Sequence, residues 1–171
     1  MHELEGVRAA FEMDGTARRL VHELKYRYYR AAAPVMAQRM GKLADGLAID
    51  SYFAVPLHRS REKERGFNQS RLLLEAAAWA PQGPGLKRTR RTERQVGQAL
   101  GDRRANVTDA FAYSGPRLDG LTVALIDDVV TTGATAAECG RVLKDAGART
   151  VWVLAFARAS YRPETSEPIE D

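Results

Sequence analysis

The sequence predicts an α/β fold in which helices flank a central, mostly parallel β-sheet. LTVALIDDVV (residues 121–130) and TVWVLAFA (150–157) are apolar runs, apart from two aspartates, as expected of strands buried on both faces. Residues 134–146 between them repeat small and apolar side chains at helical spacing, and Gly147 is a suitable stop. Together they predict a β-α-β unit with parallel strands and a right-handed crossover.

Local patterns predict the earlier elements in chain order. LEGVRAAFEM (4–13) favours an edge strand, and from Thr16 the apolar side chains recur at i, i+3, i+4 and i+7, which predicts a helix. A second helix is expected from Pro34 to about Leu43, because proline suits the first turn of a helix. YFAVPL (52–57) predicts the next strand.

The middle of the chain combines predicted elements with a long irregular stretch. QSRLLLEAAAWA (69–80) predicts a helix with Asn68 as its N-cap, and AFAY (110–113) predicts a short strand. Residues 87–106 follow neither a helical nor a strand period, and we expect a long loop there. Ligands of open parallel sheets bind at the carboxyl ends of the strands. Two polar segments, LHRSREKERGF and DDVVTTGAT, follow predicted strands, so we expect one shared site.

Composition bounds the class of protein. Residues 1–160 are expected to form a single domain, and the acidic, proline-containing residues 161–171 a disordered tail. The single cysteine, Cys139, excludes an internal disulfide and a Cys-rich zinc site. No apolar run approaches the roughly 18 residues of a membrane-spanning helix. The N-terminus has no secretory signal, so we expect a cytoplasmic protein without membrane insertion.

Positive charge is concentrated in the middle of the sequence. The formal net charge is +4, whereas residues 56–104 contain twelve Lys and Arg against five Asp and Glu. Such an excess favours an anionic ligand, either phosphate, pyrophosphate or nucleic acid. A solvated basic face is the alternative interpretation.

The stretch LIDDVVTTGAT (125–135) combines acids and a turn at a strand end. The carboxylates of Asp127 and Asp128 accept hydrogen bonds, so they suit sugar hydroxyls or a metal ion. The following turn contains threonine hydroxyls and Gly133, and it leads into a helix N-terminus, which favours phosphate. Acids for a ribose beside donors for its phosphate predict a ribose-5-phosphate pocket.

This stretch resembles the ribose-phosphate signature of type I phosphoribosyltransferases. That resemblance implies binding of phosphoribosyl pyrophosphate (PRPP) with Mg²⁺ and transfer of its ribose phosphate to a nucleophile. It assigns Asp127 and Asp128 to the ribose hydroxyls, either directly or through Mg²⁺. It assigns the following residues to the 5-phosphate: Val130, Thr131, Thr132, Gly133, Ala134 and Thr135.

Three more segments resemble the ComF/GntX family, which includes competence protein ComF. They are LVHELKYRYYR, YFAVPLHRSREKERGFNQS and RTRRTERQVGQALGDRRANVTDAF, in the family's order. The resemblance runs from about residue 7 to 158 and implies a type I phosphoribosyltransferase-like fold with a small N-terminal hood of about residues 1–50. Family members commonly begin with a zinc-binding segment of four cysteines, which this sequence lacks, so we expect either a short form or a truncated chain.

The resemblance also assigns roles outside the signature. The expected pyrophosphate loop consists of Leu57, His58, Arg59 and Ser60. The residues expected to contact the second substrate or to support the loops are Lys25, Tyr26, Arg65, Phe67, Asn68 and Gln69. The expected flexible active-site loop contains Arg90, Thr92, Gln95, Arg103 and Asn106. Core packing is the favoured alternative for Phe67.

Two functions remain open on the sequence alone. One is a phosphoribosyltransferase that binds PRPP or ribose 5-phosphate with Mg²⁺, with a family-implied role in DNA uptake during competence. The other is a non-catalytic, single-stranded-DNA-binding accessory protein that retains the PRPP pocket. Candidate partners are single-stranded DNA, competence or DNA-processing proteins, and a second copy of the chain in a homodimer.

Overall fold

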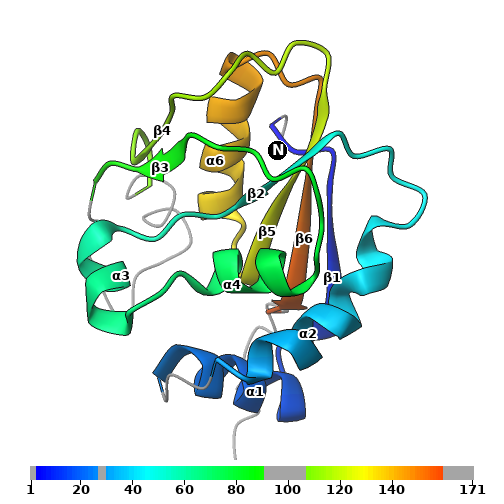
Figure 1. Cartoon of the computed structure of the whole chain (residues 1–171), viewed down its shortest axis with the longest axis vertical. Helices are drawn as coiled ribbons and strands as arrows, with labels where there is room; N and C mark the ends of the chain where they lie inside the picture. The colour runs from blue at the N-terminus through cyan, green and yellow to red at the C-terminus, as the bar shows by residue number, and fades with distance from the viewer. Residues whose placement is uncertain (1–2, 27–29, 91–106, 160–171) are drawn as a thin grey trace, which may run out of the picture.

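A four-stranded parallel sheet with the order β1-β6-β5-β2 forms the centre of the computed structural model, which describes residues 3–26, 30–90 and 107–159 (Figure 1). The two central strands are buried along most of their length, as their apolar composition predicts. The strands are β1 (Gly6–Glu12), β2 (Ser51–Ala54), β5 (Thr122–Val130) and β6 (Thr150–Arg158).

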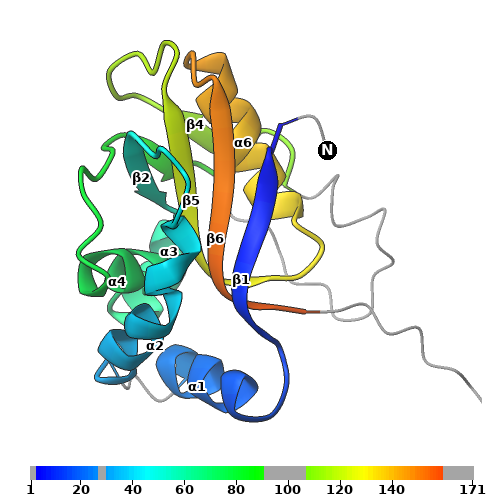
Figure 2. The ribbon, with the colours of Figure 1, turned by 90° about the vertical axis from the view of Figure 1, so that its right-hand side faces the viewer.

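Helices cover both faces of this sheet (Figure 2). On one face, α1 (Gly15–Tyr26), α2 (Ala32–Met40) and α4 (Gln69–Ala76) pack on one set of strand side chains. On the other face, α6 (Ala134–Asp145) packs on the alternate set. Successive side chains of a strand point to opposite faces, so neighbouring residues of β5 enter different cores. Ala124 and Ile126 belong to the first core, and Val123 and Leu125 to the second.

The register of the sheet leaves one edge of β5 open near its end. β5 pairs with β6 from Thr122 through Val130, but β2 pairs with β5 only from Val123 to Ile126. The N–H of Val55 makes the last contact, donating to the carbonyl of Ile126 at 2.9 Å. Beyond Ile126, β5 therefore has a strand neighbour on one side only, and Asp127 and Asp128 begin there.

Several predicted boundaries differ from the structure. The predicted strand 52–57 ends at Ala54, and the predicted helix 69–80 ends at Ala76. The helix expected to reach Leu43 ends at Met40 and continues as a 3-10 turn, η1 (Gly41–Ala44). Glycine and proline signals mark where chains turn but not which residue makes the last hydrogen bond.

Two short elements were not predicted. A helix, α3 (Arg59–Arg65), occupies part of the expected pyrophosphate loop, because its charged sequence has no apolar stripe to reveal it. The expected long loop begins with β3 (Leu86–Arg88), which pairs antiparallel with β4 (Phe111–Tyr113). The pairing partner lies far along the chain, so a local pattern could not show it.

The expected N-terminal hood shares a strand with the main sheet. β1 is an edge strand of that sheet, while α1 and α2 lie at the end of the molecule where β1 and β6 finish (Figure 1). Thr92, Gln95, Arg103, Asn106 and the expected tail 161–171 lie outside the described residues. No helix in the described part of the chain is long and apolar enough to cross a membrane.

Candidate functional site

Asp127 is held at the open edge of β5 by two hydrogen bonds to one oxygen. The hydroxyl of Ser70 donates to Asp127 Oδ1 at 3.0 Å, and the N–H of Asp128 donates to the same oxygen at 2.9 Å. Desolvation raises the pKa of Asp127, and the nearby charge of Asp128 raises it further, against lowering effects of Lys25 and the two hydrogen bonds. The carboxyl group is therefore oriented but poorly solvated.

Ser70 reaches Asp127 because α4 begins beside β5. Asn68 caps this helix as predicted: its Oδ1 accepts from the N–H of Ser70 at 2.9 Å and of Arg71 at 3.3 Å. Its Nδ2 donates to the carbonyl of Val55 at 3.0 Å, which ties the helix start to the end of β2. Ser70 was not predicted as a site residue, although its place in the first turn after a predicted N-cap was a usable signal.

Asp128 pairs with Lys25 rather than with the groups around Asp127. Its Oδ2 lies 2.7 Å from Lys25 Nζ, and the two side chains are only 10% and 18% exposed. Among the described residues this buried oxygen has no hydrogen-bond partner, so the ion pair with Lys25 is what compensates its charge. Lys25 was expected to contact the second substrate or to support the loops, and in the structure it contacts Asp128. The side chain of Tyr26 lies outside the described residues.

The turn predicted to bind phosphate, residues 130–135, is called the phosphate turn, and it borders one hollow together with Asp127. The hollow encloses about 60 Å³ and is lined by Asp127 and residues 129–136. β5 ends at Val130, α6 starts at Ala134, and Gly133 between them has a left-handed backbone with φ 75°. The first N–H groups of a helix have no partner within the helix. Thr132 Oγ1 accepts the N–H of Ala134 at 3.4 Å.

This arrangement suits an anion at the turn. The first turn of α6 contains no acidic side chain, and a helix N-terminus is the positive end of the helix dipole. Thr131 is exposed, and Thr132 and Thr135 are half-buried. A phosphate in the hollow would meet N–H and hydroxyl donors, with the Asp127 carboxyl group at its border.

The segment expected to bind pyrophosphate mainly builds α3. The ring Nδ1 of His58 accepts the N–H of Ser60 at 3.2 Å and lies 2.8 Å from its hydroxyl, so His58 caps this helix. Arg59 is exposed at the first position of the helix, and Leu57 is half-buried. None of residues 57–60 lines the hollow beside Asp127.

The residues expected to support the loops divide into packing and polar roles. Phe67 is a core residue, 9% exposed, and the guanidinium of Arg30 lies 4.9 Å from its ring centroid. Arg65 ends α3 and is half-buried. Gln69, at 2% exposure, has a buried amide nitrogen with no hydrogen bond within the described part of the chain.

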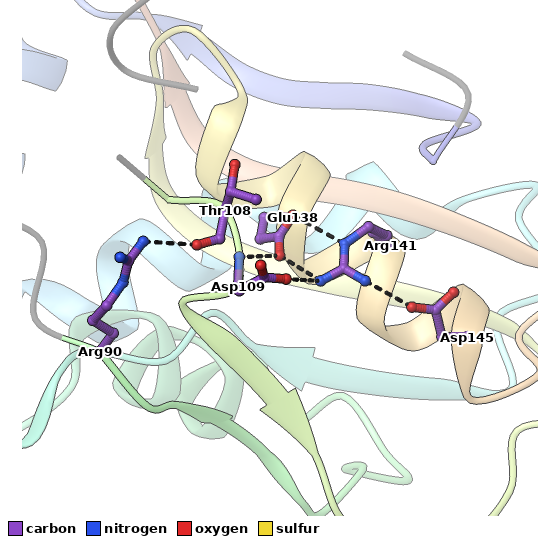
Figure 3. A network of polar contacts seen from close by, with 6 residues as sticks. All are labelled: Arg90, Thr108, Asp109, Glu138, Arg141 and Asp145. Atoms are coloured by element: carbon purple, nitrogen blue, oxygen red, sulfur yellow. Dashed lines mark hydrogen bonds and ion pairs between the residues drawn. The ribbon is translucent and has the colours of Figure 1, made fainter. Parts of the chain in front are cut away.

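A polar network includes Arg90, which belongs to the expected active-site loop, and Thr108 and Asp109, which follow that loop (Figure 3). Arg90 donates to the carbonyl of Thr108 at 2.8 Å, and the N–H of Asp109 donates to Glu138 Oε1 at 2.9 Å. Glu138 also receives two hydrogen bonds from Arg141, of 2.6 and 3.1 Å, which hold its pKa below the usual carboxyl range. The network connects this region to α6, the helix that begins at the phosphate turn. No sequence pattern pointed to it.

Comparison with known proteins gives the family. No family model matches the chain. DNA utilization protein YhgH of Salmonella typhi is 36% identical over 152 residues, which cover 81% of this chain and 66% of YhgH. Competence protein F of Haemophilus influenzae is 36% identical over 116 residues, which cover 64% of this chain and 51% of that protein. The chain belongs to the ComF family.

Membership of the ComF family confirms the resemblance found in the sequence. Competence protein ComFC of Bacillus subtilis is a further relative, 32% identical over 100 residues, or 54% of this chain and 38% of ComFC. The chain thus spans about two thirds of the length of YhgH and about half of competence protein F.

The solved structures with some similarity to this chain include phosphoribosyltransferases. The purine phosphoribosyltransferase of Pyrococcus horikoshii is 14% identical, with a TM-score of 0.46 and 80% of each chain covered. A hypoxanthine phosphoribosyltransferase of Staphylococcus aureus is 10% identical, with a TM-score of 0.48 and coverage of 79% of this chain and 71% of that chain. The parallel sheet with flanking helices agrees with the type I phosphoribosyltransferase-like class expected from the sequence. The site described above rests on this chain's own geometry.

Proposed function

We propose that this ComF-family chain binds the ribose 5-phosphate moiety of PRPP in the hollow between Asp127 and the phosphate turn. The observation that supports this most is that one hollow combines an oriented carboxyl group with a helix N-terminus. A sugar phosphate carries both hydroxyl donors and an anionic group, so it complements both halves. Inorganic phosphate would use only the turn, and a free sugar only the acid.

The chain's own residues then have separate tasks. N–H groups at the start of α6 and the hydroxyls of Thr132 and Thr135 bind the 5-phosphate. Asp127 accepts a ribose hydroxyl, and its hydrogen bond from Ser70 sets the direction in which the carboxyl group points. Gly133 adopts the left-handed conformation that the turn requires, in which a residue with a Cβ would be strained.

The acid pair also fits a substrate-bound Mg²⁺. Within the described ranges no three His, Cys, Asp or Glu side chains come together as a metal cage. Mg²⁺ often uses one or two carboxylates and takes its other ligands from water and phosphate oxygens, so Asp127 and Asp128 are suitable holders. When bound, the ion would supply neutralisation of the pyrophosphate charge.

We propose transfer of the phosphoribosyl group as the reaction. The bond between ribose C1 and the pyrophosphate oxygen breaks, pyrophosphate leaves with the electron pair, and a nucleophilic acceptor forms the new bond to C1. Positioning of the sugar by the turn and Asp127 would contribute most on the protein side. Relatives of the chain are named DNA utilization protein and competence protein, and these names support the proposal that the activity serves DNA utilization.

A non-catalytic DNA-binding function is the second candidate. The basic excess of residues 56–104 is the observation in its favour, since neutralised phosphates dominate nucleic-acid affinity. Binding of this kind would fall steeply as salt increases.

Calorimetric titration separates the two candidates. PRPP with Mg²⁺ is titrated into the wild type and into Asp127→Asn, and a single-stranded oligonucleotide is titrated at low and high salt. The proposal expects PRPP binding by the wild type that weakens about tenfold in the variant, the size of one hydrogen bond. A folded wild type that binds the oligonucleotide but not PRPP would favour the second candidate.

A further inference from the structure

Lys25 belongs to α1, yet it contacts an acid about a hundred residues away in the sequence. Its Nζ lies 2.7 Å from Asp128 Oδ2, and both side chains are largely buried. α1 is anchored by Val21 and Leu24, which are 2% and 0% exposed in the first core. Lys25 lies in the last turn of α1, where the helix dipole favours a cation. The ammonium is therefore presented by a fixed helix rather than by a mobile surface side chain.

The contact changes the charge of the site next to the phosphate turn. Asp127 and Asp128 are adjacent, and a phosphate bound at the turn would add further negative charge beside them. Lys25 pairs with one of the two acids, so the acid pair and its counter-ion carry at most one net negative charge. A carboxylate has two oxygens, and Lys25 pairs with Oδ2 of Asp128.

Exchange of Lys25 for a ligand hydroxyl is disfavoured by burial. Asp128 Oδ2 has no other polar partner among the described residues, and removing one member of a buried ion pair leaves an uncompensated charge. Asp128 also lies outside the lining of the hollow, whereas Asp127 belongs to it. The geometry thus favours a lasting counter-ion over a contact that opens for the substrate.

We infer that Lys25 is a positioning residue of the sugar-phosphate site, which acts through Asp128 by holding this carboxylate in a fixed orientation. This inference rests on the proposed function and deepens it. It makes α1, at the N-terminal end of the chain, a determinant of affinity for sugar phosphates. Lys25 then contributes to the sugar half of the site and leaves the phosphate turn itself unchanged.

The test compares two probes in matched variants. Ribose 5-phosphate and inorganic phosphate are titrated calorimetrically into wild type, Lys25→Met, Lys25→Arg and Lys42→Met. Lys42 is an exposed lysine of η1, so its loss changes net charge equally without touching the acid pair. Far-UV circular dichroism and a thermal melt establish that each variant is folded at the titration temperature.

The expected result is specific to the sugar. Lys25→Met weakens ribose 5-phosphate at least about tenfold and inorganic phosphate by less than about twofold, while Lys25→Arg recovers most of the loss and Lys42→Met matches wild type. Adding Asp128→Asn to Lys25→Met restores part of the affinity, because the uncompensated charge is gone. Equal weakening of both probes would overturn the inference in favour of direct phosphate contact, and unchanged affinity of a folded Lys25→Met would overturn it outright.

Failure of the proposed function gives a different result. In that case the wild type itself would not bind ribose 5-phosphate. Lys25→Met could melt below the titration temperature. The inference is then tested by two comparisons of ribose 5-phosphate affinity. The first compares Lys25→Arg with wild type, and the second compares Lys25→Met/Asp128→Asn with Asp128→Asn. In the latter pair, Asp128 is already neutral, so the inference expects Lys25→Met to have little further effect on affinity.

Discussion

Replacing Asn68 by alanine removes three hydrogen bonds that hold α4 beside the acid pair. Asn68 is 4% exposed; its Oδ1 accepts from the N–H groups of Ser70 and Arg71, and its Nδ2 donates to the carbonyl of Val55. Loss of an N-cap costs about 1 kcal/mol, and a buried carbonyl that loses its donor costs about 1–3 kcal/mol. We expect Asn68→Ala to lower the free energy of unfolding by about 3 kcal/mol.

Chemical denaturation followed by circular dichroism measures this change, and Asn68→Ser is the matched control. A serine oxygen can cap the helix but is too short to reach Val55, so Asn68→Ser is expected to recover about 1 kcal/mol relative to alanine. For about 3 kcal/mol the melting temperature falls by roughly 6–12 °C in a domain of this size. A loss below about 0.5 kcal/mol in Asn68→Ala, or equal losses in the two variants, would refute the assigned cap.

Three further predictions concern Asp127, the phosphate turn and the loop network. Because its folded-state pKa is raised, Asp127 binds more protons when folded than when unfolded, so wild-type stability declines as pH rises from about 4. Asp127→Asn should lack this decline and be the more stable protein at neutral pH, and equal slopes in urea titrations across pH would contradict this. Gly133→Ala and Gly120→Ala both place a Cβ at positive φ, 75° and 77°, and each should lose about 1–2 kcal/mol of stability, but only Gly133→Ala should weaken ribose 5-phosphate binding. Equal binding by both would show that the turn is not part of the site. Glu138→Gln removes a carboxylate with 11% exposure and should lower stability by about 1–2 kcal/mol, whereas Asp145→Asn, 65% exposed on the same arginine, should change it by less than about 0.5 kcal/mol. Comparable losses by the two variants in urea denaturation would contradict the assigned roles.

The elements that the sequence predicted best are those with strong periodicity. The apolar runs of β5 and β6 and the helix between them carry their own signal, because burial on both faces demands apolar residues throughout. Asn68 was predicted as a cap from residue type alone, and its capping hydrogen bonds are present. Such features depend on neighbours within one helical turn or one strand.

Contacts between distant residues could not be predicted in the same way. The pairing of Lys25 with Asp128 and the hydrogen bond of Asp109 to Glu138 join segments far apart in sequence. α3 was missed for another reason, since its charged residues have no apolar face. The candidate site residues could therefore be named from the sequence, whereas the residues that orient the acids became visible only with the fold.

The most direct test is a crystal structure of the protein with ribose 5-phosphate. We predict the phosphate at the start of α6, within hydrogen-bond distance of N–H groups in residues 131–135, and a ribose hydroxyl on Asp127, with Lys25 still on Asp128. A ligand bound elsewhere, or a phosphate in the turn with its ribose directed away from Asp127, would contradict the proposed sugar-phosphate site.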